Sequence, residues 1–209
     1  MKIHWIGHSC FKVTTGAGQV IYFDPYEIEE KTNDATLVLC SHDHYDHAEE
    51  GSIDKIFNPK AKLICPKSCL AKLKTYRAIG IDPGEKFDVG GIEIHATPAY
   101  TPTKTFHVKA NKYVGFIISL EGKTLFHAGD TDFIEEFKQL PPIEVALLPV
   151  GGTYTMDFQE ALQAVKTIKP RIVVPMHAWD TNLEEFAEMV RKDAPDTRVE
   201  ILTEKDLEI

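Results

Sequence analysis

The stretch Ser41-His42-Asp43-His44-Tyr45-Asp46-His47 follows directly on the apolar run Ala35-Thr36-Leu37-Val38-Leu39-Cys40. The apolar run predicts a buried strand, and in α/β proteins ligands bind at the carboxyl ends of strands. The residues after it bring three imidazoles and two carboxylates together, and these groups are ligands of Zn²⁺, Fe²⁺ and Mn²⁺. The segment therefore predicts a metal site at the end of a strand rather than a chance group of solvated histidines.

Composition and charge set the broad class of the protein. The chain has 209 residues, of which 43% are hydrophobic and 26% charged, so one domain spanning residues 1–209 is expected. Its net charge of −9 disfavours nucleic acid as a partner, because phosphate requires a basic surface. No run approaches the roughly 18 apolar residues of a membrane span, and no apolar secretion segment opens the chain. A cytoplasmic location is predicted, with the four cysteines as reduced, buried thiols.

The front half of the chain is predicted to consist mainly of strands joined by short turns. Residues 14–18, Gly90-Gly91 and Glu121-Gly122-Lys123 are turn signals between runs of strand-forming residues. The predicted strands are residues 2–13, 19–23, 36–40, 61–65, 86–89, 92–97, 114–120, 124–127, 145–150, 171–176 and 199–202.

Helical periodicity appears mainly in the back half. Apolar residues such as Phe158 and Val165 recur at the spacing of one buried helix face, and Asp157 or Thr155 would cap that helix. The predicted helices span residues 158–168 and 183–192, with a weaker one over residues 68–79.

The order His-x-His-x-Asp-His in residues 42–47 resembles the signature of the metallo-β-lactamase superfamily of metal-dependent hydrolases. Two later motifs fit the same family, because Gly129-Asp130 and His177 each follow an apolar strand. The resemblance implies an α/β (α+β) fold, a four-layer αββα sandwich of two mixed β-sheets flanked by helices. The metal site would then lie at one edge of the sheets.

The resemblance also implies a pair of metal ions that share ligands. The ligands implied are His42 and His44 for the first ion, Asp46, His47 and His177 for the second ion, and Asp130 as the carboxylate that bridges them.

One ligand of the family pattern is missing. Where most members have a third histidine for the first ion, this chain has Tyr100, in Pro98-Ala99-Tyr100. His107, seven residues further on, could supply the ligand from a loop or could contact the substrate instead. Both readings stay open, as does the number of ions, one or two.

Further segments resemble the branch that includes the ascorbate-6-phosphate lactonases, among them residues 4–9 and 21–25. In that branch the Gly-His turn lies near the metal edge, so His8 could line the pocket, reach the metal, or be an ordinary turn residue. Asp24 could orient a metal-ligating histidine or simply end a strand.

The predicted function is hydrolysis of a small metabolite, cyclic or phosphorylated by family resemblance. A metal-bound hydroxide would attack a lactone, another ester or a phosphodiester. Asp46 would orient the water or take its proton, and His107 or Tyr100 would donate a hydrogen bond to the developing charge. The expected cofactor is Zn²⁺, with Mn²⁺ or Fe²⁺ as alternatives.

Other functions stay open at this stage. They are a metal-dependent nuclease or phosphodiesterase, an iron-dependent redox enzyme of the same fold, and a non-catalytic metal-binding domain. A small-molecule substrate is the expected partner, without membrane or nucleic acid, and the sequence leaves open whether the chain forms a homo-oligomer.

Overall fold

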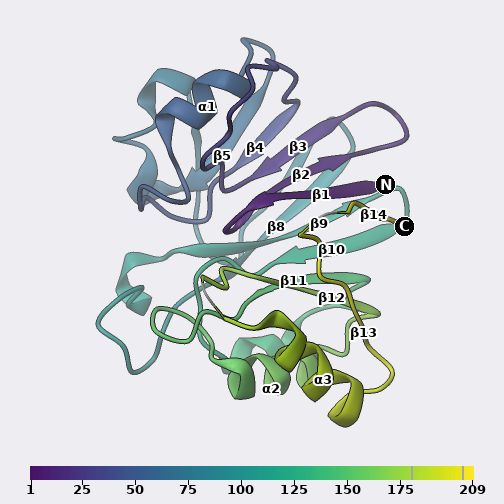
Figure 1. The fold of residues 1–209 in the computed structure, drawn as a ribbon. Coiled ribbons are helices and arrows are strands. Elements are labelled where there is room, and N and C mark those ends of the chain that lie inside the picture. Colours follow the sequence, from purple (N-terminus) through teal and green to yellow (C-terminus); the bar gives the residue numbers. More distant parts are fainter. Residues whose placement is uncertain (180, 204) are drawn as a thin grey trace.

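Two mixed β-sheets lie face to face in the computed structural model, which describes residues 1–179, 181–203 and 205–209. Figure 1 shows one helix, α1 (Glu50–Ile56), beyond the first sheet, and α2 (Phe158–Ile168) and α3 (Leu183–Asp193) beyond the second. These are the four layers that the family resemblance implies.

Each sheet has seven strands. The first runs in the order β14 (Leu207–Glu208), β1 (Lys2–Gly7), β2 (Cys10–Thr14), β3 (Val20–Phe23), β4 (Leu37–Leu39), β5 (Lys62–Pro66) and β6 (Ile79–Ile81). The second runs in the order β7 (Lys86–Val89), β8 (Ile92–Pro98), β9 (Val114–Leu120), β10 (Lys123–His127), β11 (Val145–Pro149), β12 (Ile172–Met176) and β13 (Arg198–Val199).

The two sheets repeat one pattern of strand directions. In each, three antiparallel pairs are followed by three parallel pairs, counted from β14 and from β7. Short turns join most of the antiparallel strands, whereas α1, α2 and α3 lie on crossovers between parallel strands, as such connections require. Because the two sheets have the same order of strand directions, the carboxyl ends of their parallel strands lie at one edge of the molecule.

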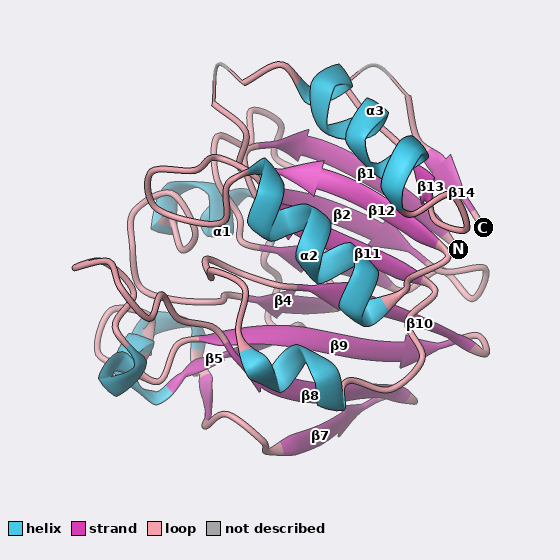
Figure 2. Cartoon of the chain, turned by 90° about the horizontal axis from the view of Figure 1, so that it is seen from below, coloured by secondary structure: helices cyan, strands magenta, loops and turns pink. Residues whose placement is uncertain are grey.

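Alternating side chains on the central strands pack against both neighbouring layers. On β11, Val145 and Leu147 lie in the core between the sheets, while Ala146 and Leu148 lie in the core under the helices. Figure 2 shows α2 and α3 covering this outer face. Because β11 is buried on both sides, it is a continuous apolar run rather than an alternating one.

The two long helices form where predicted. Asp157 caps α2 and makes a capping box with Glu160, and the helix ends at Lys169, whose φ of 52° is left-handed. Asn182 caps α3 by accepting a hydrogen bond from the N–H of Glu184. Of the helices described, none is long and apolar enough to cross a bilayer. All four cysteines are buried and unpaired, as expected.

Three predicted elements were wrong. The predicted strand over residues 2–13 is two strands, because His8 has a left-handed φ of 49° and turns the chain between β1 and β2. No α-helix forms over residues 68–79, where two 3₁₀ turns (Lys67–Cys69 and Lys74–Tyr76) lead into β6. Pairing of β6 with β5 overrides the local helical pattern. The predicted last strand, residues 199–202, is replaced by the two-residue strand β13 (Arg198–Val199). The elements α1, β6 and β14 were not predicted.

Candidate metal centre

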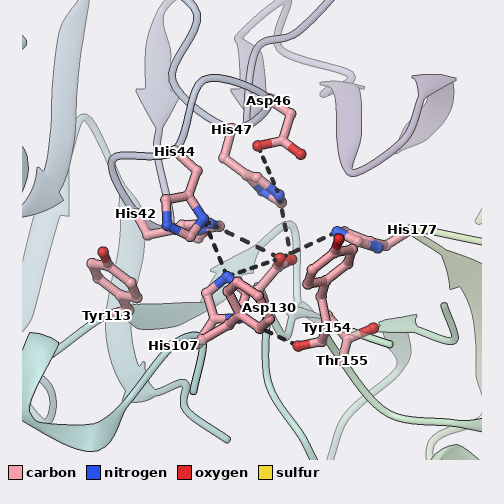
Figure 3. Close-up of polar contacts among 12 residues, drawn as sticks. His42, His44, Asp46, His47, His107, Tyr113, Asp130, Tyr154, Thr155 and His177 are labelled. Atoms are coloured by element: carbon pink, nitrogen blue, oxygen red, sulfur yellow. Dashed lines mark hydrogen bonds and ion pairs between the residues drawn. The ribbon is translucent and has the colours of Figure 1, made fainter. Parts of the chain in front are cut away.

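The predicted ligands converge at the edge where the strand ends of both sheets meet. His42 and its neighbours follow β4, Asp130 follows β10, and His177 follows β12. Their side chains point toward one another in Figure 3, although they come from segments up to 135 residues apart (177 − 42).

A first group consists of three histidines. The Nδ1 atom of His44 lies 3.0 Å from Nε2 of His42 and 3.3 Å from Nε2 of His107. Nitrogen ligands placed tetrahedrally at about 2.0–2.1 Å from a zinc ion are roughly 3.3 Å apart. The three nitrogens therefore have the spacing of ligands to one ion, and His42, His44 and His107 form one of the candidate metal-binding groups.

A second group contains His8, Asp46, His47 and His177, whose ligand atoms all lie within 4.8 Å of one another. Nε2 of His8 lies 3.3 Å from Oδ2 of Asp46, and Nε2 of His47 lies 4.0 Å from Oδ1 of the same carboxylate. The group contains every residue predicted to hold the second ion, together with His8.

The carboxylate of Asp130 lies between the two groups. Its Oδ2 is 3.3 Å from Nε2 of His107 and 3.2 Å from Nε2 of His177, and its Oδ1 is 3.4 Å from Nε2 of His47. A single carboxylate thus faces histidines from both groups, which is the arrangement that the bridging role requires (Figure 3).

The donor set fits a pair of divalent cations. Nε2 of His8, Nε2 of His47 and Oδ1 of Asp130 are buried and have no hydrogen-bond partner among the described residues. Leaving such atoms unpaired in a protein interior costs about 1–3 kcal/mol each. Bound cations would give all three atoms a partner. The burial of these unpaired atoms therefore supports a metal centre and argues against a purely structural group of buried histidines.

Asp24 fixes the orientation of two of the ligands. Its carboxylate accepts hydrogen bonds from Ser41 N and Oγ, both at 2.6 Å, and from Nδ1 of His47 at 2.7 Å. Because Ser41 Oγ donates to Asp24, it accepts from Nδ1 of His42, at 2.9 Å. Both imidazoles therefore present a free Nε2 to the centre. The structure thus places Asp24 in the orienting role considered for it, directly for His47 and through Ser41 for His42.

Burial keeps several of the histidines neutral. It lowers the pKa of His42 well below the ordinary value for histidine, and it also lowers the pKa of His107 and of His8. A neutral imidazole has the lone pair that a metal ion needs.

Charge interactions dominate at the centre of the cluster. Burial alone would raise the pKa of Asp130, but His47 and His177 lower it well below its usual range. Burial would lower the pKa of His47, but Asp130 and Asp24 outweigh this effect and hold it well above the ordinary value. Without an ion, a proton on His47 balances the buried carboxylates, and a cation would take over that role.

A short loop brings His107 to the centre. Thr101 closes the loop: its N–H donates to the carbonyl of His107 at 2.9 Å, and its hydroxyl donates to the carbonyl of Phe106. Nδ1 of His107 lies 3.3 Å from the carbonyl of Tyr154, so its Nε2 faces the other ligands. The loop thus carries a histidine into the position that the chain leaves open at residue 100.

Tyr100 itself is not brought to the site. Its hydroxyl donates to the carboxylate of Glu136 at 3.0 Å, and Lys109 lies over its ring. Its main chain still packs beside the Asp130 motif, where Thr131 Oγ1 donates to the carbonyl of Tyr100. The side chain therefore lies apart from the other predicted catalytic residues, and no role for it in catalysis is retained.

A cavity of about 660 Å³ opens over the centre. His44, Asp46, His107, Asp130 and His177 line its floor. Its remaining lining residues were not predicted as ligands or catalytic groups. Tyr45 lies within the His42–His47 motif itself, and the others lie on later loops: Phe106, Gly151, Thr153, Tyr154 and Trp179.

Comparison with known proteins agrees with this geometry. Residues 2–177 match the family model described as a beta-lactamase superfamily domain. The chain is 34% identical over 210 residues to a UPF0173 metal-dependent hydrolase of Pyrococcus abyssi, with 91% of this chain and 92% of that protein covered. It is 35% identical to one of Nanoarchaeum equitans, with 100% and 99% covered.

A solved structure has a similar fold. Igni18, a metallo hydrolase of the hyperthermophilic archaeon Ignicoccus hospitalis, superposes with a TM-score of 0.80 at 28% identity, covering 100% of this chain and 98% of that one. The two paired sheets agree with the fold of this solved structure. The chain therefore belongs to the metallo-β-lactamase superfamily, among the UPF0173 metal-dependent hydrolases.

Proposed function

We propose that this metal-dependent hydrolase cleaves a lactone, another carboxylic ester or a phosphodiester in a small metabolite. Two divalent ions, Zn²⁺ or Mn²⁺, would take part, with Fe²⁺ as the alternative. The observation that carries the proposal is the Asp130 carboxylate, which faces His107 on one side and His47 and His177 on the other within 3.4 Å.

The first ion would be held by His42, His44 and His107, and the second by Asp46, His47 and His177, with Asp130 shared. Bound ions would lower the pKa of a water molecule from about 15.7 to about 7 and polarise the scissile bond. The donor set of five imidazoles and two carboxylates suits Zn²⁺, Mn²⁺ and Fe²⁺ alike.

Asp46 is the residue best placed to handle a proton. Its carboxylate lines the cavity and is 9% exposed, so it can reach both the ions and a substrate. His8 and His47 lower the pKa of Asp46 against the effect of burial, which keeps it ionised at neutral pH. In this state it can orient an attacking water and accept its proton.

His8 and His107 are assigned to the two ions as candidate ligands rather than as proton donors. We assign His107 to the first ion, because its Nε2 lies within the first group of nitrogens. We assign His8 to the second, where its unpartnered Nε2 lies beside Asp46. As a fourth residue there, His8 either adds a ligand to the ion or holds Asp46 in position.

Metal content separates these assignments. Mass spectrometry on protein purified without chelator or affinity metal should give two ions per wild-type chain and one for His107→Ala. Tyr100→Phe is the matched control and should keep both ions. Hydrolysis of a panel of lactones, esters and phosphodiesters should be lost in His107→Ala and kept in Tyr100→Phe.

Other results would contradict the proposal. One ion per chain in both wild type and His107→Ala would exclude the two-ion site and free His107 for the substrate. Iron as the bound metal, with no hydrolysis across the panel, would favour a redox reaction in its place.

A further inference from the structure

Large hydrophobic side chains exposed to water gather at the mouth of the cavity. Among the described residues, only six large hydrophobic side chains are exposed, and four of these six line the cavity. Exposed apolar groups that cluster around a concave site mark a binding surface. The four are Tyr45, Phe106, Tyr154 and Trp179, which are 66, 46, 39 and 57% exposed.

The four side chains lie close to candidate ligands of both groups. Phe106 and Tyr154 pack edge to face, with ring centroids 4.9 Å apart, and Phe106 precedes His107 in the sequence. The ring of Trp179 lies 5.8 Å from that of His177. Tyr45 stands between His44 and Asp46 in the sequence and also lines the cavity. Apolar rings thus accompany the candidate ligands of both groups.

Positive charge is missing from the same lining. No lysine or arginine is among the described residues that line the cavity. Two lysines close behind it are already engaged: Lys104 binds Asp132 and the carbonyl of Thr155, both at 2.5 Å, and Lys72 donates to the carbonyl of Asp43 at 2.9 Å. Apart from the ions, the cavity has no charged partner for a phosphate, which proteins usually bind through arginine or lysine.

We propose that the cavity binds an uncharged substrate with an aromatic or other flat apolar group beside the bond that is cleaved. The inference rests on the proposed function and narrows it. It favours an aryl-substituted ester or lactone over the phosphorylated metabolite suggested by family resemblance. The net charge of −9 acts in the same direction, because it repels anionic substrates.

Binding of hydroxamates tests this subsite without requiring turnover. Acetohydroxamate and benzohydroxamate share one metal-binding group and differ in the aromatic ring. Calorimetry on the metal-loaded wild-type enzyme should show benzohydroxamate binding about fivefold more tightly, since stacking on aromatic side chains is worth about 1 kcal/mol. A para-phosphonate on the ring should weaken binding.

Variants locate the preference. Trp179→Ala removes the ring beside His177, and Tyr154→Ala removes one ring of the pair with Phe106. Each should reduce the preference for the aromatic ring while acetohydroxamate binds as before. Phe87→Ala is the control, because Phe87 is also an exposed aromatic residue, at 36%, but lies on β7 outside the cavity. It should leave both affinities unchanged.

Two results would overturn the inference, and they differ in what else they affect. Equal affinity for the two hydroxamates, or tighter binding of the phosphonate, would overturn the aromatic subsite alone. Binding of neither compound to protein shown to carry its ions would overturn the subsite together with the open metal centre that the proposed function needs.

Discussion

At the scale of single residues, the site depends on which nitrogen of each histidine is free. Asp24 accepts three hydrogen bonds, from Ser41 N, Ser41 Oγ and His47 Nδ1, and so uses both carboxylate oxygens. The tautomers of His42 and His47 follow from this one side chain. We therefore expect Asp24 to govern metal binding without being a ligand.

Asp24→Asn should weaken binding of the second ion by about 10–100-fold. Whichever way its amide is turned, an asparagine places an NH₂ group against a donor, either Ser41 N or the pair Ser41 Oγ and His47 Nδ1, so it cannot satisfy all three hydrogen bonds. Competition with a chromophoric chelator measures the affinity, and circular dichroism checks the fold. Asp34→Asn is the control, since Asp34 binds Lys12 and Tyr22 away from the site. Unchanged affinity in a folded Asp24→Asn variant would show that His47 needs no orienting carboxylate.

Gly151 is a second residue on which a ligand depends. A Cβ at this position would collide with the carbonyl oxygen of His177 and approach its Nδ1 to 3.1 Å. Gly151→Ala should therefore displace His177 and release the second ion, which metal analysis would detect. Gly51→Ala is the matched control, because a Cβ there meets nothing within 4 Å. Because Gly51 lies in the first turn of α1, the alanine should leave the protein folded and its metal content unchanged. Full metal content in Gly151→Ala would mean that the backbone around residue 151 shifts to accommodate the Cβ without displacing His177.

At the scale of elements, predictions from sequence succeeded for buried strands and amphipathic helices and failed where the position of a residue depends on a turn. Continuous apolar runs predicted the central strands of both sheets, and the helical period predicted α2. The break at His8 and the loop that carries His107 have no period. Their conformations depend on left-handed residues and on closing contacts such as Thr101 to His107. Motif order predicted six ligands, whereas the cavity walls required the folded loops.

The capping box of α2 gives a prediction confined to one element. Asp157→Ala removes the acceptor for the N–H of Glu160, now at 2.8 Å, and should lower the free energy of unfolding by about 1 kcal/mol. Urea denaturation measures this, and the metal content should not change. Glu188→Ala, which removes an exposed carboxylate from α3, should have a much smaller effect. Equal effects of the two variants on the free energy of unfolding would indicate that the capping box does not stabilise the protein.

At the scale of the whole molecule, the metal centre joins the two sheets. The first sheet's connections supply His42, His44, Asp46 and His47, and the second sheet's supply His107, Asp130 and His177. Ions bound there cross-link the two halves of the sandwich at one edge, while the inter-sheet core holds them together elsewhere.

Metal removal should therefore destabilise the whole protein. An ion present at 100 times its dissociation constant contributes about 2.7 kcal/mol to the folded state. Stripping each ion with a chelator should then lower Tm by roughly 5–10 °C for a chain of this size. Calorimetry with and without added Zn²⁺ would show the shift and its recovery. An unchanged Tm, with loss of metal verified, would show that the inter-sheet core alone holds the sandwich.

The order of the ligands along the chain also has a consequence in time. Four of them, His42, His44, Asp46 and His47, occupy one six-residue segment, whereas His107, Asp130 and His177 follow 60, 83 and 130 residues after His47 (107 − 47, 130 − 47 and 177 − 47). A growing chain thus carries four candidate ligands long before the residues that complete the centre exist. We therefore expect discrimination among metals to depend on the last ligands to arrive, when the second sheet closes over the first.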